Sequence, residues 1–429
     1  MVESFLKKHG LDLAALDAEA LLDSFAREAE AGLSGADSSL AMIPSYIGVG
    51  AGIPAGKPAI VVDAGGTNLR VCTVSFAADG TPEMSNFSKC AMPGVEREVG
   101  AEEFFSFIAS RVEPLVPLAS DIGFCFSYPA EITPDCDGLL LRWSKQIKAP
   151  EVVGKFVGAE LKRRLEPMGF KGRVVVLNDT VATLLAGVSE GASRNCSSYV
   201  GMILGTGTNT ATVVANSAIK KCPGLPQDAS TIVNFESGEF APVPLSDFDK
   251  RLHELTLDPG HSNFEKQISG GYLGTLGLVI LKMAAEEGLF SAKAAEAIVA
   301  LPALENRDFD DFCDNPFCTR GALASLDMED NDRRVIQALG EAVYARAALL
   351  SSVNIAFGAI LSGAGRDPLA PIGINIDGST YYKTKTADFK SRTEEGLRAI
   401  LSRRGIHFRT IFVPDSPIVG AAVAALTRG

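Results

Sequence analysis

Hydrophobic positions along this chain recur with two different periods, and each period predicts a different kind of element. Over residues 11–33, leucines and Phe25 recur at helical spacing, which predicts an amphipathic helix near the start of the chain. Further helices are expected on the same grounds near residues 180–190, 274–288, 333–357 and 387–403. Short runs of β-branched residues lie between them. Helices that alternate with strands in this way predict an α/β protein.

Three of the apolar runs end in polar turns that contain glycine. The first run reaches Val62, gives way to the turn DAGGTN at residues 63–68, and continues as a second run to Phe76. The same form recurs in YVGMILGTGTNTATVVA, residues 199–215, and a third run, PIGINID, ends at the turn DGS. The pattern predicts weak internal repeats, alike in shape rather than in sequence, with strand–turn–strand units.

Composition narrows the class of protein. The chain has 429 residues, 46% of them hydrophobic, which suits a globular protein of about two domains. Its formal net charge of −12 argues against a nucleic-acid partner for the surface as a whole, although backbone amides can still bind a phosphate locally. The N-terminal residues show neither a signal peptide nor a membrane span, so we expect no membrane partner and a cytoplasmic location. The eight cysteines form no CxxC pair and are expected to be reduced, mostly buried thiols.

The two glycine turns DAGGTN and GTGTN are candidate phosphate sites. Glycine lets a phosphate approach backbone N–H groups closely, and both turns add hydroxyl and amide side chains. Neither turn has the sequence of a Walker A loop or of a dinucleotide-binding turn. Each could equally be a structural hairpin. Asp63 ends the first strand, where a carboxylate could hold Mg²⁺ through water or could simply cap the turn.

A candidate base lies in RVVVLNDTVATLLAG, where a buried strand meets a helix at Asn178, Asp179 and Thr180. Phosphoryl transfer depends mainly on positioning and charge neutralisation, with one carboxylate orienting the nucleophile. Asp179 could do this, or it could be a helix N-cap and nothing more. Other polar residues in apolar or glycine-rich settings have the same ambiguity between sugar binding and ordinary structural roles: Ser127, Lys145, Glu236 and Glu265.

Taken together, these stretches resemble the hexokinase family, in the right order and over nearly the whole chain. DAGGTNLRV is similar to the family's first phosphate motif and GTGTN to its second; FCFSYP, GLLLRWSK, NDTVATLLAG, NFESGEF and FEKQISGGYLG are similar to its sugar-site segments; and NIDGSTYYK resembles its adenosine motif. The resemblance implies the two-lobed actin-like ATPase (ribonuclease H-like) fold around a cleft. The implied small lobe is 58–177 plus 414–429, and the implied large lobe is 1–57 plus 178–413.

The resemblance also implies residue roles. Asp179 would be the general base. The sugar would be held by Ser127, Ser144, Lys145, Asn178, Asn209, Glu236 and Glu265. The phosphates would face Asp63, Gly65, Gly66, Thr67, Asn68 and Arg70 at the first turn and Gly205, Thr206 and Gly207 at the second, with Gly378 and Ser379 near the adenosine. Asp63 would hold Mg²⁺ through water.

The implied activity is transfer of a phosphoryl group from ATP, with Mg²⁺, to the 6-hydroxyl of glucose or a related hexose. Three alternatives are a non-catalytic sugar sensor on the same fold, a sugar-responsive transcription regulator, and a structural actin-like filament. Two segments of the implied sugar site depart from the family pattern. This chain has WSKQI where the family has WTKGF, and ESGEF where the family has EWGAF, so it lacks a tryptophan beside Glu236. Residues 305–330 match no family pattern.

Overall fold

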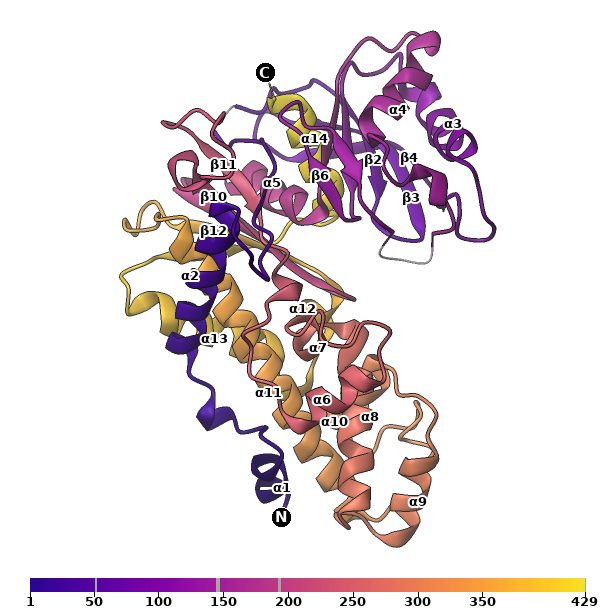
Figure 1. The fold of residues 1–429 in the computed structure, drawn as a ribbon, viewed down its shortest axis with the longest axis vertical. Coiled ribbons are helices and arrows are strands. Elements are labelled where there is room, and N and C mark those ends of the chain that lie inside the picture. The colour runs from indigo at the N-terminus through magenta and orange to yellow at the C-terminus, as the bar shows by residue number, and fades with distance from the viewer. Residues whose placement is uncertain (51, 144–146, 192–193, 429) are drawn as a thin grey trace.

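The protein, described from a computed structural model, has two lobes joined at their middle (Figure 1). The structure describes residues 1–50, 52–143, 147–191 and 194–428. Each lobe is built on its own mixed β-sheet with helices packed against it, so the prediction of a two-lobed α/β fold is confirmed.

The sheet of the smaller lobe has the strand order β4-β3-β2-β5-β8. Its strands are β2 (Ala59–Ala64), β3 (Asn68–Phe76), β4 (Pro82–Ala91), β5 (Ile122–Phe126) and β8 (Val174–Leu177). The first three are antiparallel to one another, whereas β2, β5 and β8 are parallel. A small hairpin, β6 (Ala130–Ile132) with β7 (Gly138–Leu140), lies beside this sheet.

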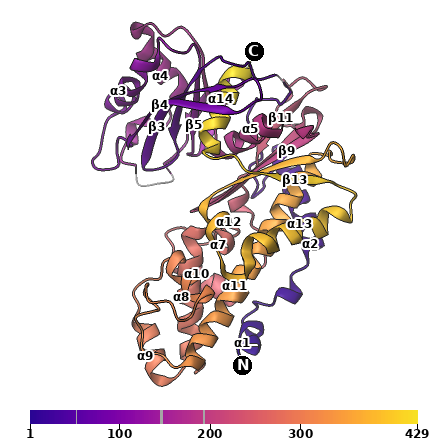
Figure 2. The same cartoon turned by 180° about the vertical axis from the view of Figure 1, so that it is seen from behind.

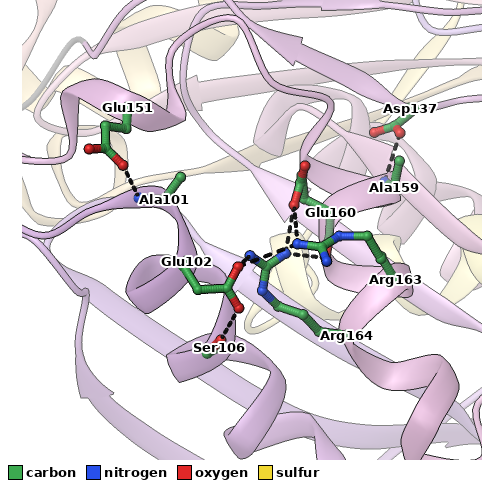
Figure 3. A network of polar contacts seen from close by, with 9 residues as sticks. All are labelled: Ala101, Glu102, Ser106, Asp137, Glu151, Ala159, Glu160, Arg163 and Arg164. Atoms are coloured by element: carbon green, nitrogen blue, oxygen red, sulfur yellow. Dashed lines mark hydrogen bonds and ion pairs between the residues drawn. The ribbon is translucent and has the colours of Figure 1, made fainter.

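Two helices of the smaller lobe, α3 (Ala101–Val112) and α4 (Val157–Leu165), are joined by ion pairs (Figure 3). The guanidinium of Arg164 donates to Glu160 at 2.6 Å and to Glu102 at 2.5 Å. Arg164 is only 9% exposed, and its ring-face contact with Phe105 places the charge over an apolar surface. The ion pairs offset part of the cost of burying this charge, although the Arg164 Nε has no hydrogen-bond partner among the described residues.

The sheet of the larger lobe repeats the topology of the smaller one. Its order is β1-β11-β10-β9-β12-β13, and β11, β10 and β9 are antiparallel while β9, β12 and β13 are parallel. The strands are β1 (Ile43–Pro44), β9 (Ser198–Leu204), β10 (Thr208–Ala215), β11 (Ser230–Asn234), β12 (Ile372–Asp377) and β13 (Phe408–Ile411). Of the three turns expected to repeat in shape, the first two each connect antiparallel strands, whereas the third leads from β12 into α12 (Ser379–Lys383).

Helices make up most of the rest of the larger lobe (Figures 1 and 2). They are α1 (Val2–Lys8), α2 (Ala18–Ser34), α6 (Asp247–Glu254), α7 (Glu265–Ile268), α8 (Gly270–Glu286), α9 (Ala292–Ala300), α10 (Asn306–Asp314), α11 (Asp330–Leu361), α12 (Ser379–Lys383) and α13 (Phe389–Ser402). α11 packs against α2, α8, α10 and α13. By length and composition α11 could cross a membrane, but 89% of its most apolar window is buried inside the protein, which is typical of a core helix.

The helix expected over residues 11–33 begins later than its apolar pattern indicates. α2 begins at Ala18, because the carboxylate of Asp17 accepts hydrogen bonds from the backbone N–H groups of Glu19 and Ala20. A capping aspartate satisfies N–H groups that the first turn of a helix leaves unpaired. The preceding residues, Leu13–Ala15, form a separate 3-10 turn.

Two helices, α5 (Asp179–Gly191) and α14 (Ser416–Thr427), join the lobes. α5 packs on β9 and β12 of the larger sheet, α14 packs on β2 and β5 of the smaller sheet, and the two helices pack on each other. Their backbones touch at Gly420, where an added Cβ atom would lie 1.7 Å from the carbonyl oxygen of Ala182. The glycine allows this approach, which brings the first turn of α5 to the space between the lobes.

Candidate active site

The first glycine turn connects β2 to β3 in the smaller lobe. Asp63 pairs with Arg70 across this hairpin, and their side chains form an ion pair with Nε 3.5 Å from Oδ2. Asp63 is buried, whereas Thr67 and Asn68 at the end of the turn are exposed. The turn therefore presents polar atoms to solvent while its acid lies at its base.

Side chains from neighbouring elements hold this turn. The Tyr128 hydroxyl donates to the carbonyl oxygen of Gly66 at 2.5 Å. Ser127 lies just before it in the chain, and its backbone N–H donates to the Ala64 carbonyl. An added Cβ at Gly65 would lie 3.6 Å from Ser127 Oγ and 3.1 Å from Asp63 Oδ1. The structure thus brings Ser127, expected at the sugar, directly beside the first turn.

The second glycine turn, Gly205–Gly207, connects β9 to β10 and is locked by backbone contacts. Gly270 donates its N–H to the Gly205 carbonyl at 2.8 Å, and Gly271 donates to the Thr206 carbonyl at 3.0 Å. The Thr380 hydroxyl also donates to the Gly205 carbonyl, at 2.8 Å. The N-terminus of α8 and the first residues of α12 therefore meet at this turn.

Gly378 fits against the same turn in a conformation that favours glycine. Its φ is 123°, and an added Cβ would lie 2.3 Å from the Leu204 carbonyl oxygen. Gly378 and the exposed Ser379 follow β12, so the residues expected near an adenosine lie next to those expected at the second phosphate turn.

Asp179 is the first residue of α5, but the side chain that accepts the capping hydrogen bond at this end of the helix is that of Asn178. Asn178 Oδ1 accepts the backbone N–H of Thr180 at 2.8 Å, whereas Asp179 Oδ1 accepts a longer bond of 3.3 Å from the Thr180 hydroxyl. Asn178 therefore caps the helix, and the carboxylate of Asp179 is not needed for that purpose.

Several buried groups respond to the charge of Asp179. Burial raises the pKa of the Cys125 thiol well above its usual value, and the charges of Asp63 and Asp179 raise it further. Burial likewise raises the pKa of Glu236 and of Asp377, and Asp179 adds to both increases. Asp179 is thus electrostatically close to Cys125 in β5, to Glu236 and to Asp377 at the end of β12.

The amide of Asn209 and the carboxylate of Glu236 form a network on the larger lobe. Asn209 Nδ2 donates to Glu236 Oε1 at 3.1 Å and to Asn234 Oδ1 at 2.7 Å, while Asn234 Nδ2 donates to the same Glu236 oxygen at 2.6 Å. Glu236 has a left-handed φ of 59°. Two amide donors on one oxygen fix the carboxylate, which leaves it suited to accept hydrogen bonds from hydroxyl groups.

Glu265 begins α7 and reaches the strand after the second turn. Its Oε2 accepts the backbone N–H of Thr208 at 2.8 Å. Burial raises the pKa of Glu265 to about 7, and the charges of Glu239, Glu236 and Asp258 contribute to the increase. This carboxylate therefore changes its charge near neutral pH.

A cavity of about 240 Å³ opens between the lobes beside these residues. Residues of the smaller lobe, of the larger lobe and of the segments on either side of β1 line this cavity. Among them are Ser38, Ser45, Phe126, Tyr128, Arg142, Asn178, Asn234, Glu236 and Glu239. Its size and its mixture of aromatic and hydrogen-bonding groups suit a small polar molecule.

Two residues expected at the sugar, Ser144 and Lys145, lie outside the described residues. The structure also adds polar residues that sequence reasoning did not select: Asn234, Glu239, Asp377 and Asp415. Asp415 lies 3.8 Å from Arg70 and directly precedes α14, without a capping bond from its side chain. A signal for it existed, because an acid between a strand and a helix also marked Asp179. For Asn234 and Glu239 the signal is only their nearness in sequence to Glu236.

The fold and site define a class of protein: a two-lobed α/β enzyme with a glycine hairpin in each lobe and a cavity between the lobes that Asn178 and Glu236 line. Comparison with known proteins identifies the family: models described as "Hexokinase" match residues 1–188 and 199–427. The chain is 31% identical to Hexokinase-2 of Candida albicans, over 95% of this chain and 88% of that protein. It is also 31% identical to a glucokinase of Aspergillus niger, over 97% and 94% of the two chains.

A solved structure agrees with these matches over the whole fold. The hexokinase of Schistosoma mansoni, determined in complex with glucose, superposes with a TM-score of 0.79 at 25% identity, covering 100% of both chains. The chain therefore belongs to the hexokinase family and is a hexose phosphotransferase.

Proposed function

We propose that this protein transfers the γ-phosphoryl group of MgATP to the 6-hydroxyl of glucose or a closely related hexose, with Asp179 as the general base. The observation that carries the proposal is the position of Asp179. Its charge acts on Cys125, which pairs with Asp63 between β5 and β2, and on Glu236, and its helix is capped by Asn178 instead. A carboxylate so placed is available to orient a hydroxyl and accept its proton.

The acceptor side of the reaction would be the cavity between the lobes. Asn178 and Glu236 line it, and Asn209 donates to Glu236 within the same network. Fixed carboxylates and amides match the alternating donor and acceptor needs of sugar hydroxyls. The glucose in the Schistosoma mansoni hexokinase structure supports glucose as the first sugar to test.

The donor side would be the two glycine turns. Thr67, Asn68 and Thr206 are exposed at the turns, and Ser379 is exposed beside the second one. Asp63 fits a magnesium ion held through water, since Mg²⁺ keeps several waters and prefers carboxylate oxygens. When bound, Mg²⁺ would offset the charge of the phosphates. Arg70, 3.5 Å from Asp63, would orient that carboxylate.

The order of events follows from this arrangement. The hexose binds in the cavity, and approach of the lobes expels water from it, which suppresses hydrolysis of ATP. Asp179 orients the 6-hydroxyl toward the γ-phosphorus and takes its proton as the new oxygen–phosphorus bond forms. The bond between the γ-phosphorus and the bridging oxygen breaks, and ADP leaves with that oxygen. Backbone N–H groups of the glycine turns stabilise the charge on the transferring group.

A panel of hexoses and nucleoside triphosphates, assayed by coupled ADP release, tests the proposal. We expect turnover with MgATP and glucose, and kcat/KM values that rank glucose, mannose and fructose. If glucose binds but no hexose is phosphorylated with any donor, the protein is a sugar sensor and the catalytic proposal is wrong.

A further inference from the structure

The motif ESGEF contains a second glutamate, Glu239, where the family pattern EWGAF has alanine. The 3-10 turn η7 (Ser237–Glu239) directly follows Glu236, and Glu239 is its last residue. The side chain of Glu239 lines the cavity between the lobes. Its carboxylate makes two hydrogen bonds, accepting the backbone N–H of Ser262 at 3.0 Å and the Ser262 hydroxyl at 3.0 Å. The side chain is 38% exposed, so this pair lies at the edge of the cavity.

Ser262 connects Glu239 to the helix that carries Glu265. The carbonyl oxygen of Ser262 accepts the backbone N–H of Lys266, in the first turn of α7. Ser262 has a left-handed φ of 55°, a conformation that costs free energy for a residue other than glycine. The two bonds from Glu239 offset part of that cost, because they hold both polar groups of Ser262 in place.

A buried lysine stiffens the loop on the other side of Ser262. The ammonium group of Lys266 is 1% exposed and donates to the carbonyl oxygens of Asp258 and His261, each at 2.9 Å. It also donates to the Thr256 hydroxyl at 3.0 Å. The loop before α7 therefore behaves as one unit with α7, so that a bond to Ser262 acts on the whole unit.

We propose that Glu239 is a positioning residue of the sugar site, which ties η7 to the loop before α7 and so holds Glu236 and Glu265 in a fixed relation. The inference rests on the proposed function, because it assigns both carboxylates to the sugar. The contact between the two units supports it: an added Cβ at Gly238 would lie 3.3 Å from Glu265 Cβ. Without the tether, the loop could move away from η7 and widen the cavity at its edge.

The charge of Glu239 gives the proposal a second consequence. Three acidic residues act on Glu265: Glu239 in η7, Glu236 directly before η7, and Asp258 in the loop before α7. The backbone N–H of Thr208, in β10, also bonds Glu265. Burial and the three negative charges raise the pKa of Glu265, and the Thr208 bond opposes them. Removing one of the negative charges lowers that pKa, so Glu265 stays ionised to a lower pH.

Four variants separate the tether from the charge: E239A, S262A, the double variant and E239Q. Glutamine keeps the geometry, since its oxygen can accept from the Ser262 N–H and its amide can donate to the Ser262 hydroxyl, but it carries no charge. Glucose is the probe. The readouts are kcat and KM with saturating MgATP from pH 6 to 9, glucose binding followed by fluorescence of Trp143, and thermal unfolding of each variant.

We expect E239A to raise the KM for glucose about tenfold, with kcat changed less than about twofold. S262A should raise KM about threefold, and the double variant should resemble E239A, because both changes remove the same tether. E239Q should keep the wild-type KM at pH 8, and the rise of its KM at low pH should begin at a lower pH than in the wild type.

The possible results of these measurements distinguish a positioning role of Glu239 from a purely structural one. If the wild type phosphorylates glucose and E239A has an unchanged KM, or if the effects of E239A and S262A add independently, the positioning role is wrong while the proposed function stands. If E239A only lowers the unfolding temperature, Glu239 is a structural residue. If the wild type neither binds glucose nor phosphorylates any hexose, the proposed function fails and the inference fails with it.

Discussion

The two glycine turns have the same form in sequence, but the tertiary structure holds them in different ways. Among the described contacts, the first turn, between β2 and β3, has one backbone bond, from the Met92 N–H to the Thr67 carbonyl at 2.9 Å. Side chains hold it as well: the Tyr128 hydroxyl donates to the Gly66 carbonyl, and Arg70 pairs with Asp63. The second, between β9 and β10, is held by backbone bonds from Gly270 and Gly271, with Gly378 packed against it. Side-chain contacts can be exchanged with little movement, whereas backbone packing cannot.

This difference suits different tasks at the two turns. The first turn has an acid at its base and exposed polar residues at its end, and it belongs to the smaller lobe, which approaches the larger lobe in the proposed mechanism. The second turn forms a rigid floor together with the starts of α8 and α12. We infer that an adjustable turn and a rigid turn act on one nucleotide from opposite lobes.

The largest expected effect comes from Asp179, whose charge reaches the elements around both turns. Replacing it by alanine should lower kcat by about 10²- to 10⁴-fold, because the acceptor hydroxyl loses its base. The KM for ATP should change little if the two turns alone bind the phosphates. Steady-state kinetics measure both values, and E296A on the exposed face of α9 is the control. Near-normal turnover by D179A would contradict the assignment.

The next effect distinguishes the rigid turn from the adjustable one. G378A should lower the free energy of unfolding by about 2–4 kcal/mol, because alanine is strained at a φ of 123° and its Cβ would lie 2.3 Å from a backbone oxygen. G65A should cost less than about 1 kcal/mol, since its Cβ would meet only side-chain oxygens at 3.1 and 3.6 Å. Chemical denaturation measures both, with G224A as the control in open space. Equal losses at Gly65 and Gly378 would remove the contrast.

A pH effect should link the sugar to the second turn. Glu265 accepts the Thr208 N–H just after that turn, and its pKa is about 7. As pH falls from 8 to 6 the carboxylate gains a proton, and the KM for glucose should rise about tenfold. E265Q should lose this pH dependence. Because the folded pKa lies above the ordinary value of 4.5, Glu265 lowers stability as pH rises from 4.5 to 7, and E265Q should lack that loss as well. A flat wild-type profile would contradict the raised pKa.

The smallest effect tests the side-chain contact of the first turn. Y128F removes the hydroxyl that donates to the Gly66 carbonyl and keeps the ring against Phe126 and Trp143. We expect the KM for ATP to rise about threefold, with little change in stability, because one hydrogen bond is lost and the carbonyl can turn to water. Y382F is the matched control, since its hydroxyl donates to Ile376 in β12. A tenfold or larger rise would show that the first turn is held as rigidly as the second.

Much of the fold follows from patterns within single segments. The helices near residues 180–190, 274–288, 333–357 and 387–403 correspond to α5, α8, α11 and α13, and the glycine hairpins lie where they were expected. The first helix was misplaced at its start, because apolar periodicity continues through a cap that only Asp17 marks. Periodicity reports which face of a segment is buried, and it says little about where the segment begins.

The candidate site also has features that follow from local sequence and features that only the tertiary structure shows. Sequence determined the residue types that chemistry requires, namely an acid between a strand and a helix, two glycine turns, and glutamates beside glycines, since each lies within a few residues along the chain. Only the tertiary structure decided that Gly378 packs on the second turn and that Glu239 binds Ser262. Those relations join residues whose contact depends on how the strands and helices pack, and a local pattern contains no record of that packing.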